Sequence, residues 1–156
     1  PTSPAVVVER LNHVLAAAEL NARFISFFFA LFNPESGELI YSNAGHNPPL
    51  LIRANGQLEW LSGGGPVLGV LAKARYEEVR CMLNSGDVVI LYSDGVTDAT
   101  NGQQEDFGEE RLSAAVQQVH IDSPDAILSA LTTAVKDWAA GTPAPDDITL
   151  VVARKT

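Results

Sequence analysis

The sequence of 156 residues contains a single cysteine, no long uninterrupted apolar run and few basic residues. Cys81 has no second thiol with which to form an internal disulfide, which fits a reducing compartment and a small core residue on a strand. The apolar stretch 24–32 is interrupted by Ser26 and is far shorter than the roughly 20 residues that a membrane helix needs. A disulfide-stapled fold and a transmembrane segment are therefore excluded for these residues.

Positive charge is scarce, with 10 Lys and Arg against 19 Asp and Glu and a formal net charge of -9. The basic residues are scattered singly along the chain, whereas nucleic acid and acidic lipid surfaces are bound through clustered Lys and Arg. We therefore expect no nucleic-acid partner and no membrane contact by this domain. A cytoplasmic location is expected, although an upstream segment could tether a full-length protein to a membrane.

The chain also lacks an initiator methionine and a signal peptide, and it opens on Pro1-Thr2-Ser3-Pro4, which is already a helix start. We therefore interpret it as a fragment of a longer protein. Its apolar content of 46% is enough for one globular domain with a buried core.

The first half of the sequence predicts a helix followed by antiparallel strands. A helix is expected from Ser3 to about Leu20, with one apolar face buried. Two hairpins should follow, one of 24–32 with 39–43 and one of 49–53 with 58–61 around Asn55-Gly56. The glycine run 62–66 lacks the Lys and Ser or Thr of a phosphate-binding Walker loop, so a plain loop is expected there. Strands at 76–83 and 88–92 should form a third pair. The buried face of the helix from Ser3 to about Leu20 is expected to consist of Val7, Leu11, Val14, Leu15 and Ala18.

The second half changes to helical periodicity and then ends on a strand. Helices are predicted at 108–119 and from Ser123-Pro124 onward, the second carrying Ile127, Leu131, Val135 and Trp138 on one face. The final strand 148–153 is apolar on both faces and is expected to be central in its sheet. Hairpins and helices segregated in sequence predict the α+β class rather than a doubly wound sheet.

Two acidic turns adjoin hydrophobic strands, Ser93-Asp94-Gly95 after one strand and Asp146-Asp147 before another. Mg²⁺ and Mn²⁺ prefer oxygen ligands, and rigid strand ends could hold several carboxylates on one ion. Taken singly, each cluster is equally typical of an ordinary turn or cap. The pair nevertheless suggests a metal site, with Asp94 and Asp146 converging on one ion at the strand ends.

Four segments together resemble a known family, the metal-dependent PPM-type (type 2C) protein serine/threonine phosphatases, and most closely their bacterial SpoIIE/RsbU branch. The segments are 39–49 (Leu39 to Pro49), 66–69 (Pro66-Val67-Leu68-Gly69), 85–99 (Ser85 to Ala99) and 146–152 (Asp146 to Val152), and 107–112 adds to the likeness. Their order and spacing agree with the family over essentially the whole chain. The resemblance implies an α-β-β-α fold, an antiparallel β-sandwich flanked by helices.

The resemblance also implies a binuclear site for Mn²⁺ or Mg²⁺, with a metal-activated water that hydrolyses phosphoserine or phosphothreonine. By motif, Asp94 and Asp146 are expected to be catalytic ligands of one ion, and Asp147 is expected to lie just behind them. His46 stands where eukaryotic relatives carry an acidic residue for an additional ion, so that ion is not expected here, and His46 is expected near Asp94 and Asp146. Gly95 is expected to allow a close backbone approach at the site.

The family's first metal motif, on an early hairpin, is absent from residues 1–156, so a partial PPM-type domain with its N-terminal strands missing is predicted. At most one set of ligands is then retained, and this chain alone should be weak or inactive. Three hypotheses stay open. The first is a phosphatase acting on a phosphorylated regulatory protein, such as an anti-sigma antagonist, under an upstream sensor or receiver domain. The second is a non-catalytic module that binds a phosphoprotein partner, and the third is a structural dimerisation domain, with a homodimer as partner.

Overall fold

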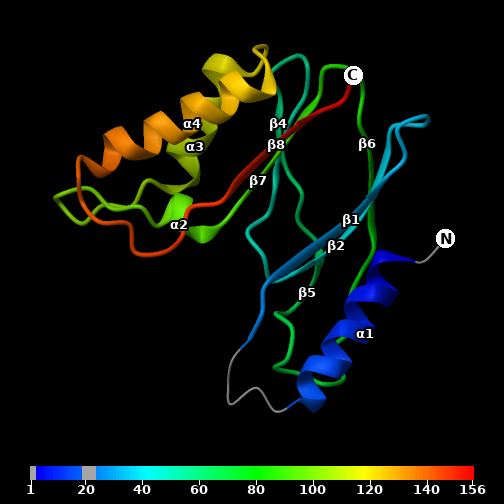
Figure 1. Cartoon of the computed structure of the whole chain (residues 1–156). Helices are drawn as coiled ribbons and strands as arrows, with labels where there is room; N and C mark the ends of the chain where they lie inside the picture. Colours follow the sequence, from blue (N-terminus) through cyan, green and yellow to red (C-terminus); the bar gives the residue numbers. More distant parts are fainter. Residues whose placement is uncertain (1–2, 19–23) are drawn as a thin grey trace. The chain divides into compact units, whose positions relative to one another are not determined.

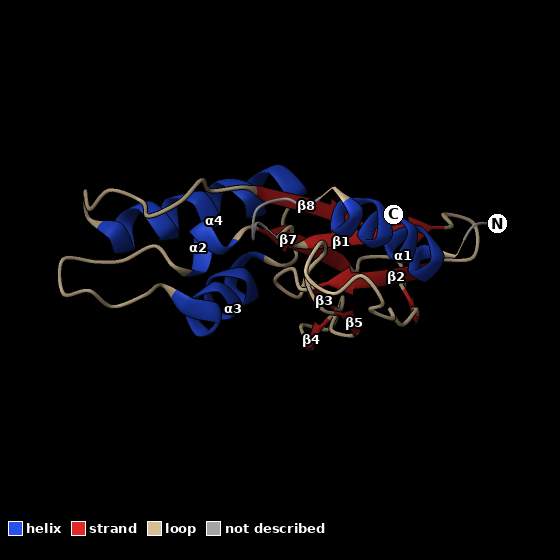
Figure 2. Cartoon of the chain, turned by 90° about the horizontal axis from the view of Figure 1, so that it is seen from below, coloured by secondary structure: helices blue, strands red, loops and turns tan. Residues whose placement is uncertain are grey.

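The chain forms two compact units, and the computed structural model describes residues 3–18 and 24–156 (Figure 1). The first unit consists of Pro1–Pro48 and Ser62–Leu83, and the second consists of Pro49–Leu61 and Asn84–Thr156. Each contains helix and a sheet of four strands (Figure 2). The predicted α+β class, with antiparallel strands and helices, is therefore confirmed.

The sheet of the first unit is built around β2 (Glu38–Ala44). Strand β1 (Phe27–Phe32) pairs with it antiparallel from Phe27 opposite Ala44 to Phe32 opposite Leu39. The β6 strand (Val79–Met82) pairs antiparallel with the first half of β2, and β5 (Gly64–Gly65) pairs parallel with its end. The predicted hairpin of 24–32 with 39–43 is confirmed, with its first strand beginning at Phe27.

The glycine run 62–66 differs from the predicted plain loop, because Gly64 and Gly65 form β5. The backbone of Gly64 lies so close to β2 that a Cβ atom there would fall 1.9 Å from the carbonyl oxygen of Asn43. Only a residue without a side chain fits, and its φ of +139° also favours glycine. The run is thus needed for strand approach, a role that its composition alone did not indicate.

Helix α1 (Pro4–Ala17) begins as predicted, with Ser3 at the N-cap position and proline in its first turn. The predicted buried face is only partly confirmed: Leu15 packs against the core of the unit, but Pro4, Val8 and Asn12 are the buried residues and Val14 is 65% exposed. The carboxamide of Asn12 explains the difference. Its Nδ2 donates to the carbonyl of Leu71 (2.8 Å) and its Oδ1 accepts from the amide of Gly69 (3.0 Å), so a polar side chain rather than an aliphatic one faces the unit. The prediction that this helix reaches Leu20 falls outside the described residues.

The second unit has a sheet in the order β4-β3-β7-β8, with every pairing antiparallel. Strands β3 (Leu50–Ile52) and β4 (Leu58–Trp60) are the predicted second hairpin, and β7 (Val88–Tyr92) and β8 (Leu150–Arg154) complete the sheet. Helix α2 (Asp94–Thr97) is a single turn after β7. The predicted third strand pair is wrong, because β6 belongs to the first unit and β7 to the second.

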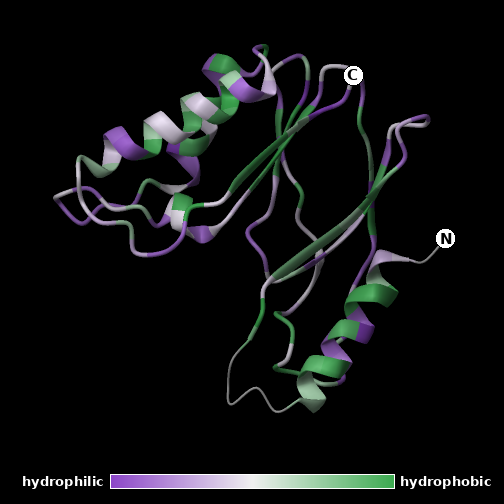
Figure 3. Cartoon of the chain, in the orientation of Figure 1, coloured by the Kyte–Doolittle hydropathy of each residue, from purple (hydrophilic) through white to green (hydrophobic). Residues whose placement is uncertain are grey.

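Helices α3 (Gly108–Val119) and α4 (Pro124–Ala139) lie beside each other against this sheet (Figures 1 and 2). Both were predicted, and each carries an apolar stripe in an otherwise mixed surface (Figure 3). Their buried side chains form one core with β3 and β7, and Arg111 stacks over the ring of Trp138 at 3.7 Å. The core residues from the two helices are Leu112, Val116, Ile127, Leu131 and Val135.

The prediction that the last strand is central is wrong for the described residues, in which β8 pairs only with β7. Its exposure alternates, and Val151 is 50% exposed. An uninterrupted apolar run is typical of a strand covered on both faces, but here the alternate side chains stay accessible. Among the described residues, no helix is long and apolar enough to cross a membrane.

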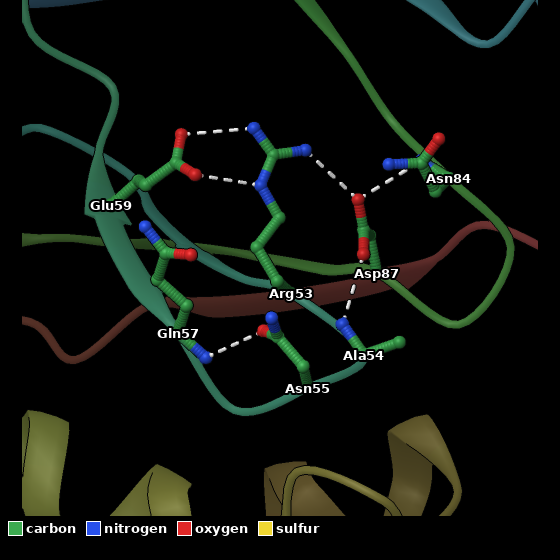
Figure 4. Close-up of polar contacts among 7 residues, drawn as sticks. All are labelled: Arg53, Ala54, Asn55, Gln57, Glu59, Asn84 and Asp87. Atoms are coloured by element: carbon green, nitrogen blue, oxygen red, sulfur yellow. Dashed lines mark hydrogen bonds and ion pairs between the residues drawn. The ribbon is translucent and has the colours of Figure 1, made fainter.

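A partly buried ion-pair network joins the β3–β4 hairpin to the start of β7 (Figure 4). Asp87 is 1% exposed and accepts hydrogen bonds from the amides of Asn84 and Ala54, each at 2.9 Å, and from Arg53 Nη1 at 3.0 Å. The guanidinium of Arg53 also donates to both carboxylate oxygens of Glu59, at 2.7 and 2.9 Å. These bonds fix the entry to β7, at the opposite end of that strand from Asp94.

Candidate functional site

Ser93, directly after β7, connects the two acidic turns of the second unit. Its amide donates to the carbonyl of Thr149 at 3.0 Å, its Oγ donates to the carbonyl of Asp147 at 2.8 Å, and the same Oγ accepts from the amide of Thr149 at 2.9 Å. The side chain therefore holds the turn at 146–149 instead of capping α2. Sequence reasoning missed this role, because a serine before Asp-Gly is also typical of a helix N-cap.

Gly95 lies buried against the second turn. A Cβ atom at this position would fall 2.4 Å from the carbonyl oxygen of Asp147 and 3.0 Å from that of Asp146. Real Cβ atoms do not approach backbone so closely, so this position requires glycine for lack of space. The two acidic turns, 52 positions apart in sequence (146 minus 94), are thus in direct backbone contact within one unit.

The carboxylates of these turns are accessible. Asp94, Asp146 and Asp147 are all exposed. One oxygen of Asp94 accepts from the amide of Gly95 (3.0 Å), and one oxygen of Asp146 accepts from the amide of Asp147 (2.7 Å). Each carboxylate therefore keeps a second oxygen that no described donor occupies, which suits carboxylate ligation of a hard cation.

The described residues contain no group of three or more His, Cys, Asp or Glu side chains placed to hold a metal ion. The donors present are carboxylate oxygens, the chemistry that Mn²⁺ and Mg²⁺ prefer, and Mg²⁺ commonly binds through only one or two protein carboxylates. In donor type the residues therefore fit a divalent ion. That Asp94 and Asp146 are ligands of one ion stays a prediction.

His46 belongs to the first unit, where local hydrogen bonds engage it. Its amide donates to Oδ1 of Asn43 at 2.8 Å, its carbonyl accepts from Nδ2 of Asn43 at 2.9 Å, and its ring Nδ1 lies 2.9 Å from the carbonyl of Asn47. These bonds close the turn after β2. Gly45 lies in this turn at φ +68°, a backbone conformation that favours glycine. A place for His46 beside Asp94 and Asp146 stays a prediction.

Comparison with known proteins places the sequence in a family. The family model described as "Stage II sporulation protein E (SpoIIE)" matches residues 1–156. Among curated proteins, the chain is 28% identical over 160 residues to the phosphoserine phosphatase RsbU of Bacillus subtilis, with 97% of this chain and 45% of RsbU covered. The chain thus spans less than half the length of that relative.

Solved structures support the fold. The SiaA-PP2C domain of Pseudomonas aeruginosa superimposes with a TM-score of 0.85 at 17% identity, covering 97% of this chain and 61% of that one. The phosphatase domain of SpoIIE from Bacillus subtilis, presoaked with Mn, gives a TM-score of 0.70 at 17% identity, covering 98% of this chain and 67% of that one. The predicted resemblance to PPM-type phosphatases of the SpoIIE/RsbU branch is confirmed. Since the family model extends over all of its residues, the chain belongs to the SpoIIE family.

Proposed function

We propose that this chain is the C-terminal part of a phosphatase domain that hydrolyses phosphoserine or phosphothreonine on a regulatory protein. The observation that carries the proposal is the backbone junction of Ser93 and Gly95 with the turn at 146–149. It brings the two acidic turns into backbone contact in a chain whose relative RsbU is named a phosphoserine phosphatase. An anti-sigma antagonist is the regulatory substrate that the SpoIIE/RsbU resemblance suggests.

In this proposal Asp94 and Asp146 hold a divalent ion through their accessible carboxylate oxygens. A Mn²⁺ or Mg²⁺ ion bound there would supply positive charge for the phosphoryl oxygens and a water of lowered pKa. Neighbouring residues of the chain position these two aspartates. Ser93 and Gly95 keep the two turns in contact, and Asp147 stands beside Asp146 with its carbonyl held by Ser93.

The chain alone is expected to hydrolyse phosphate esters weakly or not at all, because two aspartates do not complete a two-metal site. The solved SpoIIE domain that was presoaked with Mn supports the choice of metal. For the whole protein, the proposal includes a sensor or receiver domain upstream of this chain. It also includes the phosphorylated regulatory protein as substrate and a homodimer as the assembly.

The test is Mn²⁺-dependent hydrolysis of a phosphoserine peptide by this chain and by a longer version that includes the upstream hairpin. Activity only in the longer protein, abolished by Asp94→Asn, would support the proposal. Asp137→Asn is the matched control, because Asp137 is an exposed carboxylate on α4 outside both turns.

The second candidate is a non-catalytic module that binds a phosphoprotein. It is favoured by the absence, among the described residues, of any group of three or more metal-binding side chains. An extended, folded and metal-loaded protein without activity that still retains a phosphopeptide would establish this alternative and overturn the first.

A further inference from the structure

A groove in the first unit collects positive charge that is dispersed in the sequence. It has a volume of about 690 Å³ and lies between α1 and the segment that follows Leu71. Its basic residues are Arg10, Lys73 and Arg75, with His13 beside them and Glu9 as the single acid. The sequence, read linearly, predicts no basic patch. The fold brings Arg10 together with two cations more than sixty positions away.

Two of these cations pair with no carboxylate of the residues 3–18 and 24–156. Arg10 and Lys73 are exposed and form no ion pair with any residue that the structure describes. Arg75 pairs with Glu9 at 3.5 Å, but its side chain is 89% exposed, so that pair is weak. Elsewhere in the molecule, Arg80 is held by two carboxylates. The described lining of the groove therefore carries more basic than acidic side chains, Arg10, Lys73 and Arg75 against Glu9, in a chain of net charge -9.

The walls of the groove are fixed by hydrogen bonds within the unit. The buried carboxamide of Asn12 bonds the amide of Gly69 and the carbonyl of Leu71, which ties the segment to the helix. Val8, a residue of α1, is fully buried. The amide of Ala74 donates to the carbonyl of Leu71 at 2.9 Å. A groove with fixed walls loses little conformational freedom when a ligand binds.

The lining also has an apolar component. Val6 and Val14 on the helix are 40% and 65% exposed, and Ala72 and Ala74 line the opposite wall. Hydrophobic and hydrophilic residues alternate along α1 (Figure 3). A surface of this kind fits a polypeptide that presents carboxylates next to aliphatic side chains, whereas bare polyphosphate would leave the valines uncovered.

We propose that the groove between α1 and residues 72–75 is a docking site for an acidic, partly aliphatic peptide segment of a partner protein. Carboxylates of that segment pair with Arg10, Lys73 and Arg75, and its aliphatic side chains cover Val6 and Val14. Charge complementarity selects this occupant. The site is separate from Asp94 and Asp146 in sequence and unit, and docking does not depend on phosphate hydrolysis.

The test is fluorescence anisotropy of a labelled peptide of alternating Glu and Leu, titrated with the metal-free chain. The double variant Arg10→Glu/Lys73→Glu should weaken binding by about tenfold or more, because it reverses two charges in the groove. The matched control is Lys136→Glu/Lys155→Glu, which changes the net charge equally but outside the groove and should bind as the parent chain does. Val14→Ser should also weaken binding, and raised salt should weaken it further.

Circular dichroism verifies that each variant is folded, and Arg10→Gln/Lys73→Gln repeats the test if the charge reversal unfolds the chain. Equal weakening by the groove variant and its control would overturn the proposal, as would absence of binding by the parent chain. Preferential binding of a single-stranded RNA of equal charge, or of phosphatidylserine vesicles, would also overturn it. Peptide binding that is lost only in the groove variants would support it, whether or not the protein is a phosphatase.

Discussion

At the scale of single residues, the contact between the two acidic turns depends on the absence of one side chain. Gly95→Ala should destabilise the folded chain by about 1–3 kcal/mol, because the new methyl group overlaps the carbonyl of Asp147. Urea unfolding measures the change. Gly102→Ala is the control, since nothing lies within 4 Å of a Cβ atom there. Equal stability of the two variants would show that the turns are not in contact in solution.

The buried carboxylate of Asp87 should be among the most sensitive single positions. Asp87→Ala removes one carboxylate partner of the Arg53 guanidinium and the acceptor of two backbone amides, so a loss of about 2–4 kcal/mol is expected. Glu35→Gln, at an exposed turn, should stay within about 0.5 kcal/mol of the parent chain. A loss at Asp87 no larger than this control would mean that the network contributes nothing to stability.

The same residue gives the stability a pH dependence of defined sign. Burial alone would raise the pKa of Asp87, but hydrogen bonds from Asn84, Ala54 and Arg53 outweigh it and lower the pKa below its ordinary value of 3.8. The unfolded chain then takes up the proton at a higher pH than the folded one. The contribution is therefore complete above about pH 4 and is lost as the pH falls through the folded-state pKa. Unfolding free energies measured between neutral and acidic pH should decline more steeply for the parent chain than for Asp87→Asn, and parallel curves would contradict this.

At the scale of secondary-structure elements, the two N-cap serines should behave differently. Ser123 Oγ accepts from the amide of Ala126 at 3.3 Å at the start of α4, whereas Ser3 makes no such bond to α1. Ser123→Ala should therefore cost about 1 kcal/mol in thermal or urea unfolding. Ser129→Ala, at an exposed interior position of the same helix, should leave stability unchanged or slightly higher because alanine favours helix. Equal effects of the two changes would show that the cap bond is absent.

The elements that could be predicted from sequence are those whose cause is local. Asn33 accepts from the amides of Glu35 and Ser36, so the turn between β1 and β2 is encoded within a few residues. Helices α3 and α4 follow from their apolar repeat. The separation of β6 and β7 into different sheets could not be predicted, because adjacent strands joined by a short turn normally pair and nothing local indicates otherwise. The buried face of α1 was only partly predicted because Asn12, a polar residue, satisfies distant backbone groups.

The same distinction applies to the candidate site. The acidic turns stood out by residue type, and the need for glycine at position 95 was expected from a close backbone approach. The clamping role of Ser93 depends on the backbone of Thr149, 56 positions away, and no pattern in the sequence indicates which carbonyl a hydroxyl will reach. The basic groove was missed for the same reason, since its cations converge only when α1 packs on the segment after Leu71.

At the scale of the whole molecule, the second unit is closed by strands that are far apart in sequence. β7 pairs with β8 from Val88 opposite Arg154 to Tyr92 opposite Leu150, and helices α2, α3 and α4 lie between them along the chain. This pairing places the end of β7 next to the start of β8. The two acidic turns therefore lie side by side only when β7 and β8 are paired. Any ion that both turns hold should stabilise that sheet against unfolding.

Metal binding should consequently appear as thermal stability, without any measurement of hydrolysis. At Mn²⁺ tenfold above its dissociation constant, the free energy of unfolding should rise by about 1.4 kcal/mol, or roughly 3–6 °C in melting temperature. Asp94→Asn and Asp146→Asn should each remove the rise, and the double variant should lose no more than either single one, because both aspartates serve one ion. Asp137→Asn should keep the full rise. A rise that survives both single substitutions would place the ion elsewhere, and additive partial losses would mean that the two turns bind separate ions.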